Sequence, residues 1–317
     1  MRNLVAAALF VLGAASAIAQ PYPTRPVRLL VGFAPGGGVD ISARLLAPKL
    51  SEHLGQQIVV ENKPGAGTNI ANEAVAKSPP DGYTLLFNSP AVVINTSLYK
   101  SPPYQLRDFI GVSIFAATSN LLVVPAALEA RTAADLVKIA KQRPGVLNYS
   151  SAGPGTTQHL AGELFKLRTG TDIVHVPFKG SAPSLTALLA GNVQLSFVNP
   201  VAVGQHVKAG RLRALAVADS KRTELMPEVP TLKEAGIEGV EVSLWYALLA
   251  PAATPRDIVE KLAAGVGRAA RDPETRQRLR DQGAEPVGNT SAQFNQLLRE
   301  ELERWSEVVR VSGARVD

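Results

Sequence analysis

The sequence predicts an α/β protein of two lobes, and three observations support this prediction. Short apolar segments typical of buried strands alternate with segments in which apolar residues recur at helical spacing. Glycine-rich loops stand where an expected strand passes into an expected helix. The 317 residues exceed one typical domain of about 100–200 residues, and no long or low-complexity linker interrupts them. We therefore expect two α/β lobes that are joined by ordered strands.

The composition agrees with a folded protein and excludes several kinds of site. Hydrophobic residues make up 46% and charged residues 19% of the chain, which allows a large core and excludes global disorder. The absence of cysteine excludes disulfides, thiolate metal sites, a cysteine nucleophile and a lipid anchor on an N-terminal cysteine. The formal charge is +6, but the basic residues are scattered, so we expect no nucleic-acid partner.

Residues 1–19 have the pattern of a secretory signal peptide. A positive start at Arg2 precedes an apolar stretch of about 12 residues, and Ala17-Ile18-Ala19 then supplies a small-x-small cleavage site. The apolar stretch is shorter than the ~20 residues that a permanent membrane helix needs, so an N-terminal anchor is the less favoured alternative. We expect cleavage of the signal peptide and a mature protein that is free in the periplasm.

The first part of the mature chain predicts parallel βαβ units. Strands are expected over residues 27–31, 58–61 and 84–87. A helix is expected between the first two strands, with Gly55 as its C-terminal stop. Its apolar residues are Ile41, Leu45, Leu46, Leu50 and Leu54.

The same alternation continues after residue 120. A capping box from Thr132 to Asp135 starts one helix, Thr156 starts another that ends at Gly170, and a third precedes Gly191. Strands are expected around these helices, over residues 121–124, 147–150, 173–176, 193–198 and 212–217.

The C-terminal part is expected to be helical after a last strand over residues 243–249. We expect Thr254 and Asp257 to form a capping box, with Pro255 at the first helical position. Two more helices are expected, over residues 272–282 and 291–310. The last one carries a packing stripe that places Trp305 in the core: Phe294, Leu298, Leu302, Trp305 and Val309.

Three glycine-rich loops are the candidate binding elements, over residues 32–40, 62–70 and 150–159. We name them the first, second and third loop. Each follows a strand and enters a helix, so the backbone can approach a ligand and the N–H groups at the helix start can attract an anion. Open α/β sheets bind ligands at this edge, so we expect an anion between the lobes.

Each of these features also has a purely structural explanation. A glycine-rich loop can be only a tight turn between strand and helix. Asp40 can favour the helix dipole or receive a ligand amine or hydroxyl. His159 can contact the ligand or have a structural or capping role, and Lys179 can add a cation to the anion site or be a solvated surface charge.

The motifs of common enzymes are missing, so the sequence predicts no catalytic site, cofactor or metal ion. There is no G-x-S-x-G elbow, and Ser97-Leu98-Tyr99-Lys100 lacks the companion motifs of S-x-x-K enzymes. Ile70 stands where a dinucleotide fingerprint needs its third glycine, and the four histidines lack metal-ligand spacing.

Two other classes of protein remain as alternatives. The first is a secreted serine hydrolase that uses Ser150 or Ser151 with His159. The second is a ligand-sensing transcription regulator, which would need a helix-turn-helix segment where this chain has its signal peptide.

Seven motifs carry a resemblance to a known family. In chain order they are Tyr22-Pro23-x-Arg25-Pro26-Val27, Pro35-Gly36-Gly37-Gly38-Val39-Asp40, Val60-Glu61-Asn62-Lys63-Pro64-Gly65-Ala66-Gly67, Pro80-Asp81-Gly82-Tyr83-Thr84-Leu85, Ser151-x-Gly153-x-Gly155-Thr156-x-x-His159-Leu160, Val176-Pro177-Phe178-Lys179-Gly180 and Trp245-Tyr246-x-Leu248-Leu249-Ala250-Pro251-Ala252. With these motifs the chain resembles the Bug-type (tripartite tricarboxylate transporter, TctC-like) periplasmic substrate-binding receptors. The resemblance covers residues 22–314.

The resemblance implies a type II periplasmic-binding-protein fold, in which two α/β lobes close on a ligand and two crossing strands join them. The crossings would lie near residues 118–124 and 241–248. The first lobe would comprise residues 22–121 plus 245–317, and the second lobe residues 122–244.

The resemblance also implies the ligand, the partners and the site. The ligand would be a small carboxylate such as a dicarboxylate, an amino acid or an aromatic acid, held by N–H groups, hydroxyls and ordered water. The protein would be a monomer that docks on a membrane permease or on the outer domain of a sensor kinase. The implied ligand-binding residues are Phe33, Pro35, Gly36, Gly37, Asp40, Thr68, Ser89, Ser150, Ala152, Gly155, Thr156, Thr157, His159, Phe178, Lys179, Gly180, Asn199 and Trp245.

Overall fold

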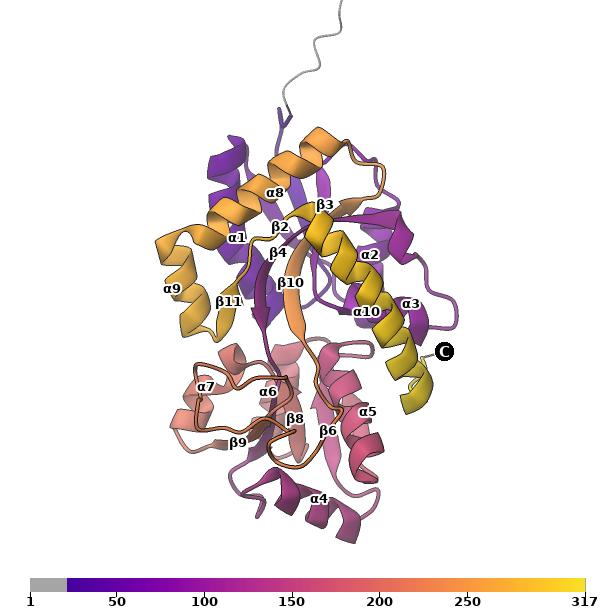
Figure 1. Cartoon of the computed structure of the whole chain (residues 1–317), viewed down its shortest axis with the longest axis vertical. Helices are drawn as coiled ribbons and strands as arrows, with labels where there is room; N and C mark the ends of the chain where they lie inside the picture. The colour runs from indigo at the N-terminus through magenta and orange to yellow at the C-terminus, as the bar shows by residue number, and fades with distance from the viewer. Residues whose placement is uncertain (1–21, 317) are drawn as a thin grey trace, which may run out of the picture.

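The computed structural model describes residues 22–316, which form two lobes along the long axis of the molecule (Figure 1). Each lobe holds one β-sheet covered by helices, so the expected α/β class is confirmed. The expected signal peptide, residues 1–19, lies outside the described residues. Among the described residues, no helix has both the length and the apolar character needed to cross a membrane.

The first sheet has six strands: β1 (Val27–Val31), β2 (Ile58–Asn62), β3 (Thr84–Asn88), β4 (Phe109–Thr118), β10 (Leu244–Pro251) and β11 (Ala284–Pro286). Their order is β11-β4-β10-β3-β1-β2. β1 is parallel to β2 and β3 because α1 (Gly38–Leu54) and α2 (Asn69–Ala76) return the chain between successive strands. β10 is antiparallel to both β3 and β4.

Helices cover both faces of the first sheet, because successive strand residues point to opposite sides. Leu29 and Leu85 pack in one cluster with α1 and α8 (Arg256–Arg271). Leu30 and Leu86 pack in the other cluster, which includes residues of α2 and of helices from both lobes. The remaining elements of this lobe are η1 (Ala66–Thr68), α3 (Ala91–Leu98), η2 (Leu106–Asp108), α9 (Pro273–Asp281) and α10 (Ser291–Ser312).

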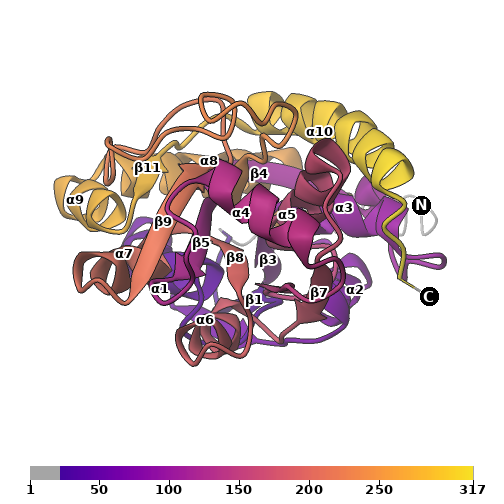
Figure 2. The same cartoon turned by 90° about the horizontal axis from the view of Figure 1, so that it is seen from below.

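The second sheet has five strands: β5 (Leu121–Pro125), β6 (Asn148–Ser151), β7 (Val174–Pro177), β8 (Leu195–Val198) and β9 (Leu212–Val217). Their order is β7-β6-β8-β5-β9. α5 and α6 lie on opposite sides of this sheet (Figure 2). The helices of this lobe are α4 (Ala133–Gln142), α5 (Thr157–Thr169), α6 (Ser181–Leu189) and α7 (Pro200–Lys208).

The chain passes between the lobes twice. It leaves the first lobe where β4 ends at Thr118 and enters the second where β5 begins at Leu121. It returns through residues 218–243, which follow β9 and precede β10 (Figure 1). β4 and β10 pair beside each other in the first sheet, and α10 also contacts α5 of the second lobe. The strands therefore bring the edges of both sheets to a common cleft.

Most of the expected elements are confirmed, two of them to the residue: β1 over residues 27–31 and β9 over residues 212–217. Among the described elements, six were not predicted: the helices α3 and α7, the strands β4 and β11, and the short 3-10 helices η1 and η2.

Candidate ligand-binding site

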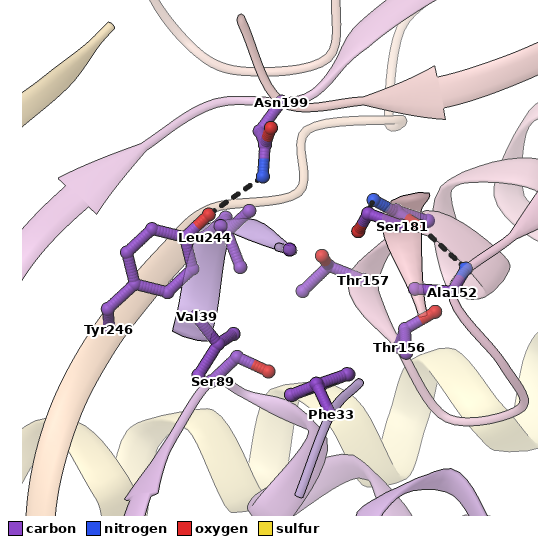
Figure 3. A pocket seen from close by; sticks show the side chains of 13 residues that line it. Phe33, Val39, Ser89, Ala152, Thr156, Thr157, Ser181, Asn199, Leu244 and Tyr246 are labelled. Atoms are coloured by element: carbon purple, nitrogen blue, oxygen red, sulfur yellow. Dashed lines mark hydrogen bonds between the residues drawn. The ribbon is translucent and has the colours of Figure 1, made fainter. Parts of the chain in front are cut away.

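A cavity lies between the two lobes and is lined by thirteen residues from both of them (Figure 3). Of the described residues that line it, none carries a charged side chain. The lining residues are Phe33, Gly37, Gly38, Val39, Ser89, Ala152, Thr156, Thr157, Gln158, Ser181, Asn199, Leu244 and Tyr246.

Four helices begin at the wall of this cavity. Gly37 is the N-cap of α1, Thr156 of α5 and Asn199 of α7, and Ser181 is the first residue of α6. The first N–H groups of a helix have no intrahelical acceptor and carry partial positive charge. An anion can therefore be bound here by backbone dipoles and hydroxyls without a cationic side chain.

Asp40 holds the first loop rather than lining the cavity. Its carboxylate accepts hydrogen bonds from Gly36 N (3.0 Å), Arg44 Nε (3.0 Å) and Asn62 Nδ2 (2.8 Å). Burial opposes ionisation of this carboxyl, but the three donors outweigh burial and hold the pKa of Asp40 below its ordinary value. Asn62 also donates to Phe33 O (3.0 Å), so the network fixes both ends of the loop.

The second loop is held against the first by close packing. A Cβ on Gly32 would lie 2.6 Å from Thr68 Cβ, so only glycine allows this approach. Thr68 Oγ1 accepts a hydrogen bond from Asn72 Nδ2 (3.0 Å), and Asn72 Oδ1 accepts one from Asn88 Nδ2 (2.7 Å). These buried amides connect the second loop to the end of β3.

The third loop is tied to its own helix and to α6. Thr156 Oγ1 donates to Gly153 O (2.8 Å) and accepts from His159 N (3.3 Å) as the N-cap of α5. Gln158 accepts from Ala152 N (2.7 Å) and donates to Ser181 Oγ (3.2 Å). This side chain therefore joins two of the helix starts that face the cavity.

The lobes touch each other around the cavity, so this is a closed arrangement. Asn199 Nδ2 of the second lobe donates to the Tyr246 hydroxyl of the first (2.8 Å; Figure 3). A Cβ on Gly155 would overlap Asn95 Oδ1 of the first lobe. Lys221 Nζ and Glu285 Oε1 form an ion pair (3.0 Å) between the returning chain and β11.

The sequence-predicted site residues fall into three groups. Those that line the cavity are Phe33, Gly37, Ser89, Ala152, Thr156, Thr157 and Asn199. Those that line a neighbouring hollow, which Phe33 and Ala152 also border, are Thr68, Phe178 and Lys179. Those that line neither are Pro35, Gly36, Asp40, Ser150, Gly155, His159, Gly180 and Trp245.

Trp245 and Tyr246 occupy opposite faces of β10. The Trp245 ring packs edge-on against Phe294 of α10, with ring centroids 5.2 Å apart. It belongs to a cluster of buried residues that includes other side chains of α10. Tyr246 lines the cavity instead, since adjacent strand residues alternate. Burial raises the pKa of Tyr246, so its hydroxyl stays protonated.

Sequence reasoning missed six lining residues: Gly38, Val39, Gln158, Ser181, Leu244 and Tyr246. All of them adjoin or fall within segments that the sequence singled out. Ser181 follows Gly180 directly, and the hydroxyl at a helix start was the signal that could have identified it.

The two serines proposed for a hydrolase lie outside the cavity lining. Ser150 is fully buried and accepts a hydrogen bond from Ser184 Oγ (2.8 Å). Ser151 is also fully buried, and its hydroxyl pairs with His175 Nε2 (2.7 Å) rather than with His159. No group of three or more possible metal ligands occurs among the described residues.

Comparison with known proteins connects this architecture to a family. A family described as "Tripartite tricarboxylate transporter family receptor" matches residues 42–313. The BugT protein of Bordetella pertussis is 39% identical over 306 residues, which cover 96% of this chain and 94% of BugT.

Solved structures with the same architecture include two complexes. An R. palustris protein solved with adipate is 39% identical with a TM-score of 0.88, covering 93% of this chain and 100% of that one. MatC of Rhodopseudomonas palustris, solved with malate, is 33% identical with a TM-score of 0.87 (91% and 100%). The periplasmic binding protein BugD is 31% identical with a TM-score of 0.88 (93% and 99%). The chain therefore has the two-lobed fold of periplasmic binding proteins and belongs to the Bug-type receptors of the tripartite tricarboxylate transporter family.

Proposed function

We propose that this protein is a periplasmic receptor that captures a small carboxylate between its two lobes. The observation that carries the proposal is the cavity at which four helices begin and whose lining residues hold no charged side chain. Such a site favours an anion that brings its own negative charge. The adipate and malate complexes of two relatives support a dicarboxylate in particular.

Binding would proceed without a covalent step. The ligand enters the open cleft and its carboxylate meets the N–H groups of α1 and α5, with the hydroxyls of Ser89, Thr156 and Thr157 beside them. Fixed dipoles then replace the water around the carboxylate, so that it stays ionised when buried. Because only the closed form offers contacts from both lobes, the ligand shifts the population towards closure.

We also propose which segments move together as lobes and where the closed receptor docks. Residues 22–121 plus 245–317 would move as one lobe and residues 122–244 as the other. The signal peptide would be cleaved on export, and the closed monomer would dock on a membrane permease or a sensor domain. The proposed receptor binds its ligand unchanged, without an enzymatic step.

A thermal-shift screen tests this proposal. Refolded, ligand-stripped protein is heated with malate, adipate, citrate, acidic amino acids, nicotinate and aromatic acids, and with adipamide as the uncharged control. At about 100-fold excess over the dissociation constant, a ligand adds roughly 2.7 kcal/mol of stability, a shift of several degrees. The proposal predicts a shift with at least one carboxylate and none with adipamide. A flat result across all the carboxylates would contradict it.

A further inference from the structure

A stack of three aromatic rings lies beneath the third loop, outside the cavity lining. Tyr149 of β6 stacks on His175 of β7, with centroids 4.8 Å apart and planes inclined by 22°. His175 in turn stacks on His159 of α5 at 4.2 Å and 21°. Tyr149 and His159 are buried and His175 is half-buried. Neither histidine is needed for the direct contacts proposed above.

Both histidines form hydrogen bonds with residues 151–155 of the third loop, and His159 is the last residue of that loop. His175 Nε2 pairs with Ser151 Oγ (2.7 Å), and that oxygen accepts a hydrogen bond from Gly153 N (3.1 Å). His159 Nδ1 accepts a hydrogen bond from Gly155 N (3.3 Å). The stack thus binds the loop directly at Ser151 and Gly155, and Ser151 in turn binds Gly153.

The position of this loop determines two functional contacts. Its Ala152 and Thr156 line the cavity. Its Gly155 packs against Asn95 of the other lobe, and its Pro154 packs against Gly67, where the chain leaves no room for a Cβ. A small displacement of the loop would therefore disturb both ligand contact and lobe closure.

The observed geometry requires a neutral His159 ring and disfavours charge on both rings at once. Nδ1 of His159 can accept from Gly155 only when it carries no proton. Two stacked imidazolium rings at this distance would repel each other. The charged groups that act on the rings are Lys166 and Glu163 of α5, and the Tyr149 hydroxyl donates to Glu163 Oε1 (2.6 Å).

The environment supports this neutral state. Burial, with Lys166 nearby, lowers the pKa of His159 to about 4. Burial and the neighbouring His159 lower the pKa of His175 to about 3. Both histidines take up protons near pH 6.5 in the unfolded chain, so stability is lost as the pH falls from about 6.5 towards 4 for His159 and towards 3 for His175.

We propose that His159 and His175 are positioning residues that, as a neutral pair, hold the third loop in its ligand-binding conformation. The effect on ligand affinity rests on the proposed function, whereas the effect on the loop does not. Two kinds of measurement therefore separate failure of this inference from failure of the receptor hypothesis.

The loop is tested first in ligand-free protein by ¹⁵N NMR. At pH 7 we expect neutral His159 with its proton on Nε2. The Gly155 amide signal should shift in His159→Leu, which loses the acceptor, and return towards its original position in His159→Asn, whose Oδ1 can replace Nδ1. A charged His159, a proton on Nδ1, or an unchanged Gly155 signal in His159→Leu would overturn the inference.

Affinity for adipate and malate is tested second, by calorimetry. His159→Leu should bind about tenfold more weakly at pH 7, with His159→Asn restoring most of the loss. As the pH falls to about 4, the affinity of the original protein should fall more than that of His159→Asn. We compare the two affinities as a ratio at each pH, because protonation of the ligand affects both proteins equally. His206→Gln on α7 is the control and should match the original protein.

Each affinity result has a defined meaning. Equal affinity of His159→Leu and the original protein, or failure of His159→Asn to restore binding, would overturn the inference. If neither adipate nor malate binds the original protein, the dicarboxylate proposal fails for these probes and the NMR result alone decides the inference.

Discussion

At the residue scale, Asp40 and Tyr246 serve the cavity in different ways. The Asp40 carboxylate accepts a hydrogen bond from Gly36 N of the first loop and others from the side chains of Arg44 and Asn62. Tyr246 lines the cavity and holds Asn199 of the opposite lobe. One residue therefore shapes a binding element, whereas the other joins the two lobes around the ligand.

We predict that Asp40→Asn loosens the first loop. The substitution removes the charge that pairs with Arg44, and one of the three donors loses its acceptor. Unfolding free energy should fall by about 1–3 kcal/mol in urea titrations at pH 7. Asp81→Asn, at an exposed ion pair with Arg25, is the control and should change stability by less than about 1 kcal/mol.

The loss of stability in Asp40→Asn should depend on pH, because the pKa of Asp40 is lowered in the folded protein. The ionised carboxyl stabilises the fold above the ordinary pKa of 3.8, and this contribution is lost as the pH falls through the lower, folded-state value. The difference in stability between the two proteins should therefore shrink in acid. A difference that is independent of pH would contradict the role assigned to the charge.

We predict that Tyr246→Phe weakens carboxylate binding by about three- to tenfold, because Asn199 loses its partner across the cavity. Calorimetry with the carboxylate that gives the largest thermal shift provides the measurement. Tyr83→Phe, near the N-terminal end of β3, is the control for loss of a tyrosine hydroxyl. Equal affinities for Tyr246→Phe and the original protein would show that this contact does not contribute to binding.

At the scale of elements, the chain places helix starts and close-packed loops at one cleft. In the strand–loop–helix units of both lobes, the N-termini of the helices face the same cavity. Glycines at the lobe contacts allow backbone to approach backbone. The third loop is the element in which these two requirements coincide, since it borders both the cavity and the first lobe.

We predict that Gly155→Ala prevents full closure, because the new Cβ would overlap Asn95. Carboxylate affinity should fall by at least about tenfold, a loss of roughly 1.4 kcal/mol. Gly170→Ala is a matched control: its φ of +62° resembles the +73° of Gly155, but no atom lies within 4 Å of the added Cβ. Both variants bear a similar backbone strain of about 1 kcal/mol, so their difference in affinity measures the lobe contact alone.

Two outcomes of this comparison are decisive. Combining Gly155→Ala with Asn95→Ala removes the obstructing amide and should recover part of the affinity. If Gly155→Ala and Gly170→Ala bind the carboxylate equally well, the close approach of the third loop to α3 is not needed for binding.

The sequence predicted elements best where local signals and packing agree. The β1 strand, the Thr132 capping box and the stripe of α10 all combine a clear pattern with a buried face. α3 and α7 were missed because their β-branched residues favour strands locally, whereas burial and the Asn199 cap favour helices in the folded protein. β4 was missed because its residues are buried on both faces and show no alternation.

At the scale of the whole molecule, the two lobes are closed around an internal cavity. The loops that the sequence singled out come together there because parallel strands end at the same edge of each sheet. Which residue of a motif points inward depends on the strand register, which the motif does not determine. The adjacent residues Trp245 and Tyr246 illustrate this limit.

We predict that Glu285→Lys disfavours closure by placing a positive charge opposite Lys221. The pair is exposed, so affinity for the carboxylate should fall only about two- to fivefold at low salt and recover at high salt. Glu260→Lys, at the exposed Arg256 pair within α8, adds the same charge away from the lobe contact. Equal effects of the two variants would assign the change to net charge rather than to closure.

The most direct test of the receptor hypothesis is calorimetric titration of ligand-stripped protein with adipate and with adipamide, followed by malate and its diamide. The receptor hypothesis predicts binding of one dicarboxylate per chain and at least about 100-fold weaker binding of the matching diamide, because the cavity contributes dipoles and the ligand contributes the charge. Equal affinity for acid and diamide, or no binding of either dicarboxylate, would contradict the receptor hypothesis.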